Sequence, residues 1–454
     1  MPQARRIAAG ILISGLVLQA ASSRADEPAI PPGSELTLDH AVELARHYNP
    51  GLRSVESESR AAVERVGEAR STFLPQVYAV GEYLRATDNG IGDTAYLPAL
   101  GISRAPSTGR FEHVLSETFD NYTAGLSLFQ YLFDFGRARG VLEERNAESD
   151  AEQARLRLVD LDLVYQVSSS YFDLVGAKQV VKVYEEAVTQ RTERLNAVKA
   201  KAKAGLKPEI DTFTAEAELA RAKLHLVDAR NAAATAKVAL DNAMGLGESA
   251  PDYTQPDTFG PATAGQPLES YLHQAMDQRP DLKMLEDEAR AAGARIEEYQ
   301  SDYLPTLGAA AGYNLRGQDT APANNFYAGV VISWPLFNGF LTEHEVEESR
   351  LRQDAVHHMI EDLRQRVVFQ VERSYLDLQA SVDRIHQAEQ TVQASQVELD
   401  LATKRYENGL GSILELTDAQ RRFTEDGAAF VKAQADSAIA KAALDRDTGS
   451  GLQP

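Results

Sequence analysis

The 454-residue chain has a formal net charge of −21 and contains no cysteine. The absence of cysteine excludes disulfides, thiolate metal sites, cysteine nucleophiles and a cysteine-borne lipid at a mature N-terminus. The acidic balance argues against nucleic-acid binding, because phosphate contacts need clustered Lys and Arg.

Residues 1–25 have the pattern of a secretory signal peptide. Arg5 and Arg6 precede an apolar run over residues 7–18, and small residues follow up to Ala25. A charged segment, a short apolar segment and small residues near the cleavage site are typical of export signals. The apolar run is shorter than the roughly 20 residues of a spanning helix, which disfavours a membrane anchor. We therefore expect an exported protein.

Helices and strands are predicted in a regular order along the mature chain. The expected elements of the first half are helices at 36–48 and 52–73, a strand at 76–84, a long loop at 85–121, a strand at 122–129 and a helix at 137–204. The first two helices stop before Pro50 and Pro75, because proline cannot continue a helix. In the second half we expect strands at 306–315 and 325–334, followed by another long helix.

The two halves of the chain repeat each other. Asn49-Pro50 recurs as Arg279-Pro280, 230 residues later (279 − 49). Beyond the second strand the spacing is 204 residues (409 − 205), as between Gly205-Leu206 and Gly409-Leu410. The difference places extra residues in the loop between the first two strands. We therefore predict three parts after the signal peptide: a first structural repeat over 26–249, a proline-rich linker over 250–267 and a second repeat over 268–454.

Each predicted strand alternates an apolar face with a face of small or polar residues. Leu126 and Leu128 face one way, for example, whereas Gly125 and Ser127 face the other. Stretches of roughly 9–11 residues with this alternation suit tilted strands that cross a bilayer. A soluble sheet packed on helices alternates in the same way, so the pattern by itself leaves both alternatives open.

The predicted helix 137–204 contains no proline and keeps one heptad register. Its apolar positions recur every seven residues, at Val167, Leu174, Val181, Val188, Leu195 and Ala202. The second half repeats this register from Val371 to Tyr406. A seven-residue repeat makes neighbouring helices supercoil, so each half is expected to hold an antiparallel coiled hairpin. A helix of roughly 67 residues is about 100 Å long, which suits a spacer rather than the wall of a compact core.

Four strands cannot close a membrane barrel, because bacterial outer-membrane barrels have at least about eight strands. An open edge in lipid leaves backbone groups unpaired, so other copies of the chain must complete the sheet. An eight-stranded barrel from two copies would be filled by side chains, whereas twelve strands from three copies would leave an aqueous lumen. These considerations favour a trimer over a dimer.

Several short segments follow one another in a distinctive order. They are Leu36–Val42 with Asn49-Pro50, Phe73–Pro75, Leu132–Asp134, Tyr303–Pro305 and the two hairpin turns. In their order and spacing they resemble the TolC-like outer membrane efflux protein family, along essentially the whole mature chain. The resemblance implies a mixed fold of membrane β-barrel and α-helical barrel. Four strands and long coiled-coil helices per chain would be completed in a homotrimer, as a 12-stranded barrel and a 12-helix periplasmic tube.

The resemblance also implies partners and site residues. The partners are outer-membrane lipid, a periplasmic adaptor (membrane fusion protein) and an inner-membrane pump of the RND or ABC type. Glu415 and Asp418 match acids of a cation-selecting constriction, and they share one helix face because they are three residues apart. Tyr406 matches a tyrosine that latches the tip shut, and Asp211 matches its partner acid. The alternative for the two constriction acids is that they only cap and solvate a helix start, where acids are favoured.

One position at the second turn departs from the family. Gly411 stands where TolC itself has an arginine, so that arm of the closing network is missing here. Lys207 or Arg405 is expected to replace it, unless the tip is held shut differently.

The turn apices are Gly205-Leu206 and Gly409-Leu410. Glycine suits a helix–helix turn, and an exposed leucine there suggests a docking contact. In the family this region receives the adaptor's hairpin, so we expect Gly205, Leu206, Gly409 and Leu410 to form the adaptor-docking surface. The alternative is that each leucine packs across its own turn.

Catalysis finds no support in the sequence. The nine histidines are scattered, and His344-Glu345 lacks the second histidine of a zinc-protease helix. We therefore expect no enzyme activity, no metal and no cofactor. The expected function is a passive, gated outer-membrane exit channel of a tripartite efflux or type I secretion system. The alternative is a soluble periplasmic coiled-coil scaffold or adaptor, in which the alternating segments would not face lipid.

Overall fold

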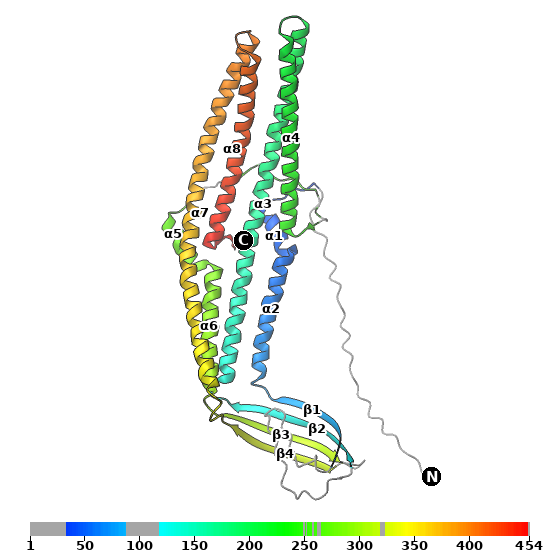
Figure 1. The fold of residues 1–454 in the computed structure, drawn as a ribbon, viewed down its shortest axis with the longest axis vertical. Coiled ribbons are helices and arrows are strands. Elements are labelled where there is room, and N and C mark those ends of the chain that lie inside the picture. The colour runs from blue at the N-terminus through cyan, green and yellow to red at the C-terminus, as the bar shows by residue number, and fades with distance from the viewer. Residues whose placement is uncertain are drawn as a thin grey trace, which may run out of the picture.

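The computed structural model describes residues 33–87, 118–247, 250, 252–256, 258–260, 265–317 and 323–452. The expected signal peptide, most of the 85–121 loop and part of the 250–267 linker lie outside the described residues, and the predicted domain boundaries stay predictions. Long helices extend from one side of a small β-sheet, and their hairpin turns lie at the end of the molecule farthest from the sheet (Figure 1).

The two halves contain the same elements in the same order. The first half consists of α1 (Leu38–Tyr48), α2 (Pro50–Ser71), β1 (Gln76–Thr87), β2 (Thr118–Phe133), α3 (Arg137–Lys203) and α4 (Glu209–Met244). The second half consists of α5 (Leu268–Gln278), α6 (Pro280–Ser301), β3 (Thr306–Gly317), β4 (Ala323–Ser333), α7 (Leu341–Glu407) and α8 (Ile413–Thr448), followed by the short 3-10 helix η4 (Ser450–Leu452). Matching helices have equal lengths, with 67 residues in both α3 and α7. The predicted repeat and its long helices are therefore confirmed.

Local sequence signals set the helix starts. Thr37 caps α1, because its side chain accepts a hydrogen bond from the amide of His40. Asn49 caps α2 in the same way, and Pro50 follows at the first helical position, where a missing N–H costs nothing. Helix α1 consequently begins at Leu38, two residues later than the apolar pattern alone predicts.

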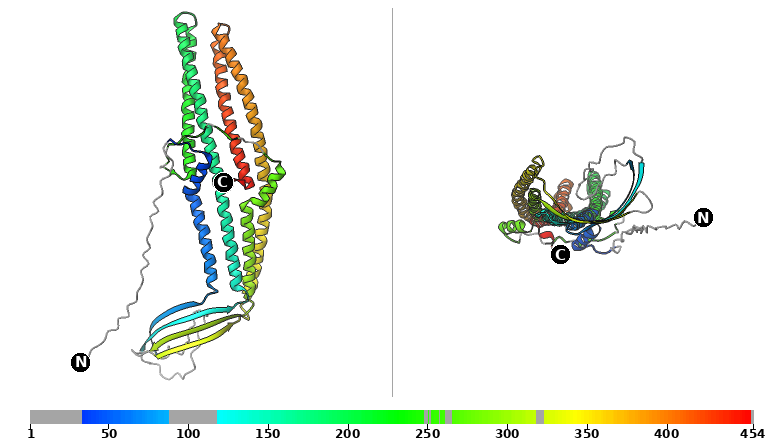
Figure 2. Two further views of the ribbon diagram at one scale, coloured as in Figure 1. Left: turned by 180° about the vertical axis from the view of Figure 1, so that it is seen from behind. Right: turned by 90° about the horizontal axis from the view of Figure 1, so that it is seen from below.

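The four strands form one antiparallel sheet in the order β1-β2-β3-β4. The row Ala79, Leu126, Tyr313 and Phe326 crosses all four strands in register, which confirms the predicted apolar face. On the opposite face a Cβ added to Gly312 would lie 2.5 Å from the ring of Tyr327, so this ring needs a glycine beneath it. The sheet is curved when seen along the helices (Figure 2). Among the described residues, β1 and β4 each pair along one edge only.

The helices lie side by side and not around a central core. Next to the sheet the contacts run in the order α2-α3-α6-α7, and toward the tips they run α4-α3-α8-α7. Helices α3 and α7 extend through both sections (Figure 1). Heptad positions form the seams: Val167 and Leu174 are fully buried in the first half, as are Val371 and Leu378 in the second. No helix within the described ranges has the length and apolar character needed to cross a membrane.

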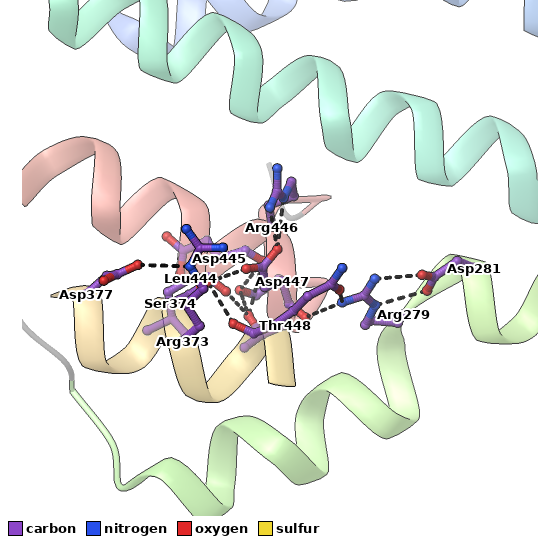
Figure 3. A network of polar contacts seen from close by, with 12 residues as sticks. Arg279, Asp281, Arg373, Ser374, Asp377, Leu444, Asp445, Arg446, Asp447 and Thr448 are labelled. Carbon is purple, nitrogen blue, oxygen red and sulfur yellow. Dashed lines mark hydrogen bonds and ion pairs between the residues drawn. The ribbon is translucent and has the colours of Figure 1, made fainter. Parts of the chain in front are cut away.

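A polar network fixes the end of α8 against the α5–α6 junction (Figure 3). Arg279 forms a bidentate ion pair with Asp281, with N–O distances of 3.0 and 2.6 Å. The same guanidinium donates to the side chain of Gln370 on α7 and to the main-chain carbonyl of Asp447 on α8. The Asp447 carboxylate accepts from Ser374 on α7. One arginine therefore connects three helices at mid-height of the molecule.

Candidate functional site at the helix-hairpin tips

The two hairpin turns have the same backbone geometry. Gly205 and Gly409 adopt left-handed conformations with φ of +72° and +73°, which glycine tolerates without strain. In each turn the next amide closes back onto the long helix, Leu206 N to Lys201 O at 2.9 Å and Leu410 N to Arg405 O at 2.8 Å. This is the glycine-terminated helix end of the Schellman type.

Both apical leucines are exposed. The side chain of Leu206 is 73% exposed and that of Leu410 is 74% exposed, so neither is mainly packed across its own turn. Each tip therefore presents one exposed apolar side chain at the equivalent position of the repeat. Their expected role in adaptor docking stays a prediction.

Glu415 lies in the first turn of α8 and forms an ion pair with Arg405 at the end of α7. The Arg405 Nε to Glu415 Oε1 distance is 2.8 Å, and the same guanidinium donates to the carbonyl of Leu410. The helix cap is supplied by Ser412, whose hydroxyl accepts from the amide of Glu415 at 3.1 Å. The carboxylate of Glu415 is therefore not the cap, and it is partly neutralised by an arginine of its own hairpin.

Asp418 is also paired with cations of its own helix. Its carboxylate accepts from Arg421 at 2.8 Å and from Arg422 at 2.5 Å. The hydrogen bond from Arg421, followed by that from Arg422, lowers the pKa of Asp418 below its usual value. Both predicted constriction acids therefore form surface ion pairs with arginines of their own hairpin.

Tyr406 and Asp211 meet at a buried contact between the two hairpins. The Tyr406 hydroxyl donates to Asp211 Oδ2 at 3.0 Å, although the residues are 195 positions apart. Tyr406 is 2% exposed and Asp211 is 7% exposed. Burial, then the hydrogen bond to the Asp211 carboxylate, raises the pKa of Tyr406 to about 12. The structure therefore brings together the two residues expected to form the latch.

The surroundings of Tyr406 combine an apolar seam with two cations. Val198, Leu399 and Leu416 belong to the apolar cluster that also contains the tyrosine. The Lys207 ammonium lies 4.1 Å from the centre of the Tyr406 ring, and the Arg194 guanidinium lies 5.9 Å from it. The sequence does not indicate Arg194 as a site residue. The heptad pattern marks apolar positions such as Leu195, and Arg194 lies beside that position.

The opposite end of the molecule exposes many aromatic side chains where the sheet meets the helices. The group consists of Phe73, Phe133, Phe135, Tyr303, Trp334, Phe337 and Phe340, all of them exposed. The indole of Trp334 donates to the carbonyl of Tyr303 at 3.1 Å, which fixes its ring at the end of β4. Aromatic rings with one polar edge are typical of the interface between membrane and water.

Within the described ranges, no group of three or more His, Asp or Glu side chains is placed to hold a metal ion.

The comparisons with known proteins are consistent with one another. A family described as outer membrane efflux protein matches residues 41–246 and 271–450. The outer membrane efflux protein BepC of Brucella suis is 23% identical over 98% of this chain and 90% of its own length. The outer membrane protein TolC of Escherichia coli is 24% identical over 84% of this chain and 76% of its own length.

Solved structures show the same fold. The outer membrane channel CmeC of Campylobacter jejuni superimposes with a TM-score of 0.77 at 17% identity, covering 91% of this chain and 86% of that one. The family match spans most of both structural repeats, including α3, α4, α7 and α8. The chain therefore belongs to the outer membrane efflux protein family, with its sheet in the outer membrane and its helices in the periplasm.

Proposed function

We propose that three copies of this chain form an outer-membrane exit channel, which passes substrates from an inner-membrane machine to the cell exterior. The family assignment favours this channel over a soluble periplasmic scaffold. The observation that carries the assembly is that, among the described residues, each copy has an open edge at both sides: β1 and β4 are the edge strands of the sheet, and α4 and α7 are the outermost helices toward the tips.

The sheet supports closure with further copies. Its outer strands, β1 and β4, run antiparallel to each other because the order β1-β2-β3-β4 alternates in direction. The free edge of β4 in one copy can therefore pair with β1 of the next while keeping the antiparallel alternation. Backbone groups at an open edge would be unsatisfied in lipid, so closure is required. Three copies give twelve strands, which leaves a lumen.

The helices support the same assembly. Helices α4 and α7 are the outermost of the four toward the tips, and both expose large apolar side chains at heptad-related spacings. On α4 these are Ile210, Leu224 and Val238, and on α7 they are Phe369, Leu376 and Val397. Helix α3, which lies between two neighbours, exposes no large apolar side chain. Apolar stripes that recur in steps of seven are typical of a coiled-coil seam, so α4 of one copy is expected to pack on α7 of the next.

The membrane-facing part supports lipid contact. The apolar face of the sheet exposes Leu126, Tyr313, Phe326, Val330 and Ile332. Aromatic residues lie at the helix side of this face, where a belt at the membrane interface is expected. We assign this face to outer-membrane lipid.

The tips supply the gate of the proposed channel. Tyr406 and Asp211 form the latch, and Glu415 with Asp418 forms the constriction once three copies are assembled. The two turn apices, Gly205-Leu206 and Gly409-Leu410, bind a periplasmic adaptor. The adaptor connects the tube to an RND or ABC pump. The channel is passive and uses no cofactor, so its partners supply the energy for export.

The test combines assembly with conduction. Native mass spectrometry of the detergent-purified protein is expected to show a trimer, and planar bilayers are expected to show a small conductance. Leu224→Lys with Val238→Lys, on the exposed stripe of α4, is expected to reduce the trimer fraction. The matched control is Gln190→Lys, an exposed polar position on α3. A monomer without conductance would contradict the channel, and equal effects of both variants would contradict the α4–α7 contact.

A further inference from the structure

The two turns carry different residues at the second position after the left-handed glycine. Lys207 and Gly411 are related by the repeat spacing of 204 residues (411 − 207), and each lies two residues after the left-handed glycine of its turn. The first tip therefore carries a cation where the second tip carries no side chain. The backbone closes in the same way in both turns, so at this position only the first tip offers a charge to the contact between the hairpins.

Lys207 makes two contacts with one residue of the other hairpin. Its ammonium lies 4.1 Å from the centre of the Tyr406 ring and donates to the main-chain carbonyl of Tyr406 at 3.3 Å. The ring face is electron-rich, and the carbonyls of the last helical turn carry the negative end of the α7 dipole. Both contacts therefore favour the positive charge, and the side chain is half-buried, which weakens screening by water.

The other cations at the tip make different contacts. Arg405 donates to Glu415 and to the carbonyl of Leu410, both of which belong to its own hairpin. A Cβ at Gly411 would lie 3.1 Å from both the Arg405 Cβ and a Glu415 carboxylate oxygen. A side chain at position 411 would therefore crowd that ion pair. Arg194 is farther from the ring, at 5.9 Å, and pairs with Glu407 at 3.6 Å.

We propose that Lys207 is the positioning residue that holds the second hairpin against the first, by fixing the ring and the last-turn carbonyl of Tyr406. The inference rests on the proposed gate and identifies the cation that closes it. Asp211 and Lys207 then hold Tyr406 at three points: Asp211 binds its hydroxyl, and Lys207 binds its ring and its carbonyl. Opening the tip must break all three contacts together.

The first test is conduction of trimeric channels in planar bilayers. Lys207→Met keeps the length of the side chain and removes its charge, and it is expected to raise the open probability roughly tenfold, the scale of one partly buried cation–π contact. Lys207→Arg keeps the charge and is expected to stay near wild type. Lys203→Met removes an exposed lysine from the same helix end and serves as the matched control.

A double-variant comparison separates the ring contact from the hydroxyl contact. Tyr406→Phe removes the hydroxyl and keeps the ring, so adding Lys207→Met is still expected to increase opening. Tyr406→Leu removes both, so adding Lys207→Met is expected to have a much smaller effect. Equal effects of Lys207→Met in the two backgrounds would overturn the ring contact.

A second readout does not depend on conduction. Because the chain has no cysteine, Leu206→Cys with Leu410→Cys places a spin label on each tip without competing thiols. Lys207→Met is expected to lengthen or broaden the distance between the labels, and Lys207→Arg is not. If wild-type protein fails to conduct, the proposed function fails while this distance measurement still tests Lys207. If it conducts and Lys207→Met changes neither conductance nor distance, the inference is wrong.

Discussion

Asn49 and Arg279 stand at equivalent positions of the two repeats and make the same contact. Each side chain donates to a main-chain carbonyl at the end of the returning helix, Asn49 to Ala243 at 3.0 Å and Arg279 to Asp447 at 3.3 Å. The two carbonyls are themselves 204 residues apart (447 − 243). The duplication has therefore kept the junction between the short helices and the returning helix, while the side chain that makes it changed from an amide to a guanidinium.

This difference predicts unequal costs of mutation at the two junctions. Asn49→Ala removes a helix cap and one hydrogen bond, so it is expected to cost about 1–2 kcal/mol. Arg279→Met leaves the buried carboxylate of Asp281 unpaired and is expected to cost about 3 kcal/mol or more. Thermal unfolding in detergent, followed by circular dichroism, is expected to show the larger decrease in Tm for Arg279→Met.

The control for this prediction removes both charges. Arg279→Met with Asp281→Asn leaves no isolated charge and keeps an acceptor for the amide of Leu282. The double variant is expected to unfold at a higher temperature than Arg279→Met alone. A double variant that is less stable would mean that the ion pair itself, and not the unpaired carboxylate, sets the cost.

Gly245 ends α4 in a left-handed conformation and lies directly against the α1–α2 junction. A Cβ there would approach the carbonyl oxygen of Tyr48 to 2.7 Å. Gly247 also has a positive φ, but apart from its chain neighbours no atom of the described residues lies within 4 Å of a Cβ built there. Gly247→Ala is expected to cost about 1 kcal/mol from backbone strain alone. Gly245→Ala is expected to cost about 1–3 kcal/mol more, because the backbone must move. Equal decreases in Tm would contradict the close approach.

The latch predicts an alkaline titration at the tip. The pKa of Tyr406 is raised to about 12, so the closed tip binds the phenolic proton more tightly than an open, solvated tip would. The stabilisation is fully present below pH 10, the ordinary range of tyrosine, and is lost as the pH rises from 10 to 12. The ultraviolet difference between wild type and Tyr406→Phe is expected to show ionisation near pH 12. Ionisation near pH 10 would mean that the hydroxyl is not buried against Asp211.

The ion pairs of the constriction acids predict changes of opposite sign. Glu415→Gln with Asp418→Asn is expected to lower the preference of the channel for cations, because it removes negative charge at the tip. Arg405→Gln frees Glu415 from its ion pair and is expected to raise that preference. Reversal potentials in a salt gradient measure both effects. Asp354→Asn, an exposed position elsewhere on α7, is the control and is expected to have no effect.

The pH dependence of selectivity tests Asp418 separately. Its pKa is lowered by Arg421 and Arg422, so its charge persists while the pH falls through the ordinary aspartate range near 3.8. Cation preference in a Glu415→Gln background is therefore expected to persist to pH values below this range. Loss of the preference above pH 4 would show that Asp418 is not held by the two arginines.

Much of the fold could be predicted from local patterns. The strand expected at 306–315 is observed at 306–317, and the helix expected at 137–204 ends one residue earlier, at Lys203. Alternation and heptad spacing arise because one face of a strand or helix is buried, so these patterns predict where strands and helices lie. The strand expected at 122–129 extends over 118–133 instead, because pairing with β1 and β3 continues beyond the alternating segment.

The candidate site was only partly predictable. Tyr406 and Asp211 were matched by family resemblance, and the structure places them in contact. The choice between Lys207 and Arg405 could not be made from the sequence, because both cations lie within a few residues of a turn. Arg194 was missed because it flanks an apolar seam, and its distance to Tyr406 depends on how the hairpins align.

The sequence by itself determined the duplication, the element order, the apolar face of the sheet and the heptad seams of the helices. Each of these depends on interactions between residues close in the chain or on a periodic burial pattern. Only the tertiary structure decided that Lys207 reaches Tyr406, and that Glu415 and Asp418 are already paired with arginines. Such contacts depend on the relative alignment of helices and on side-chain direction, because two hairpins about 200 residues apart in sequence meet with a precision of a few ångströms.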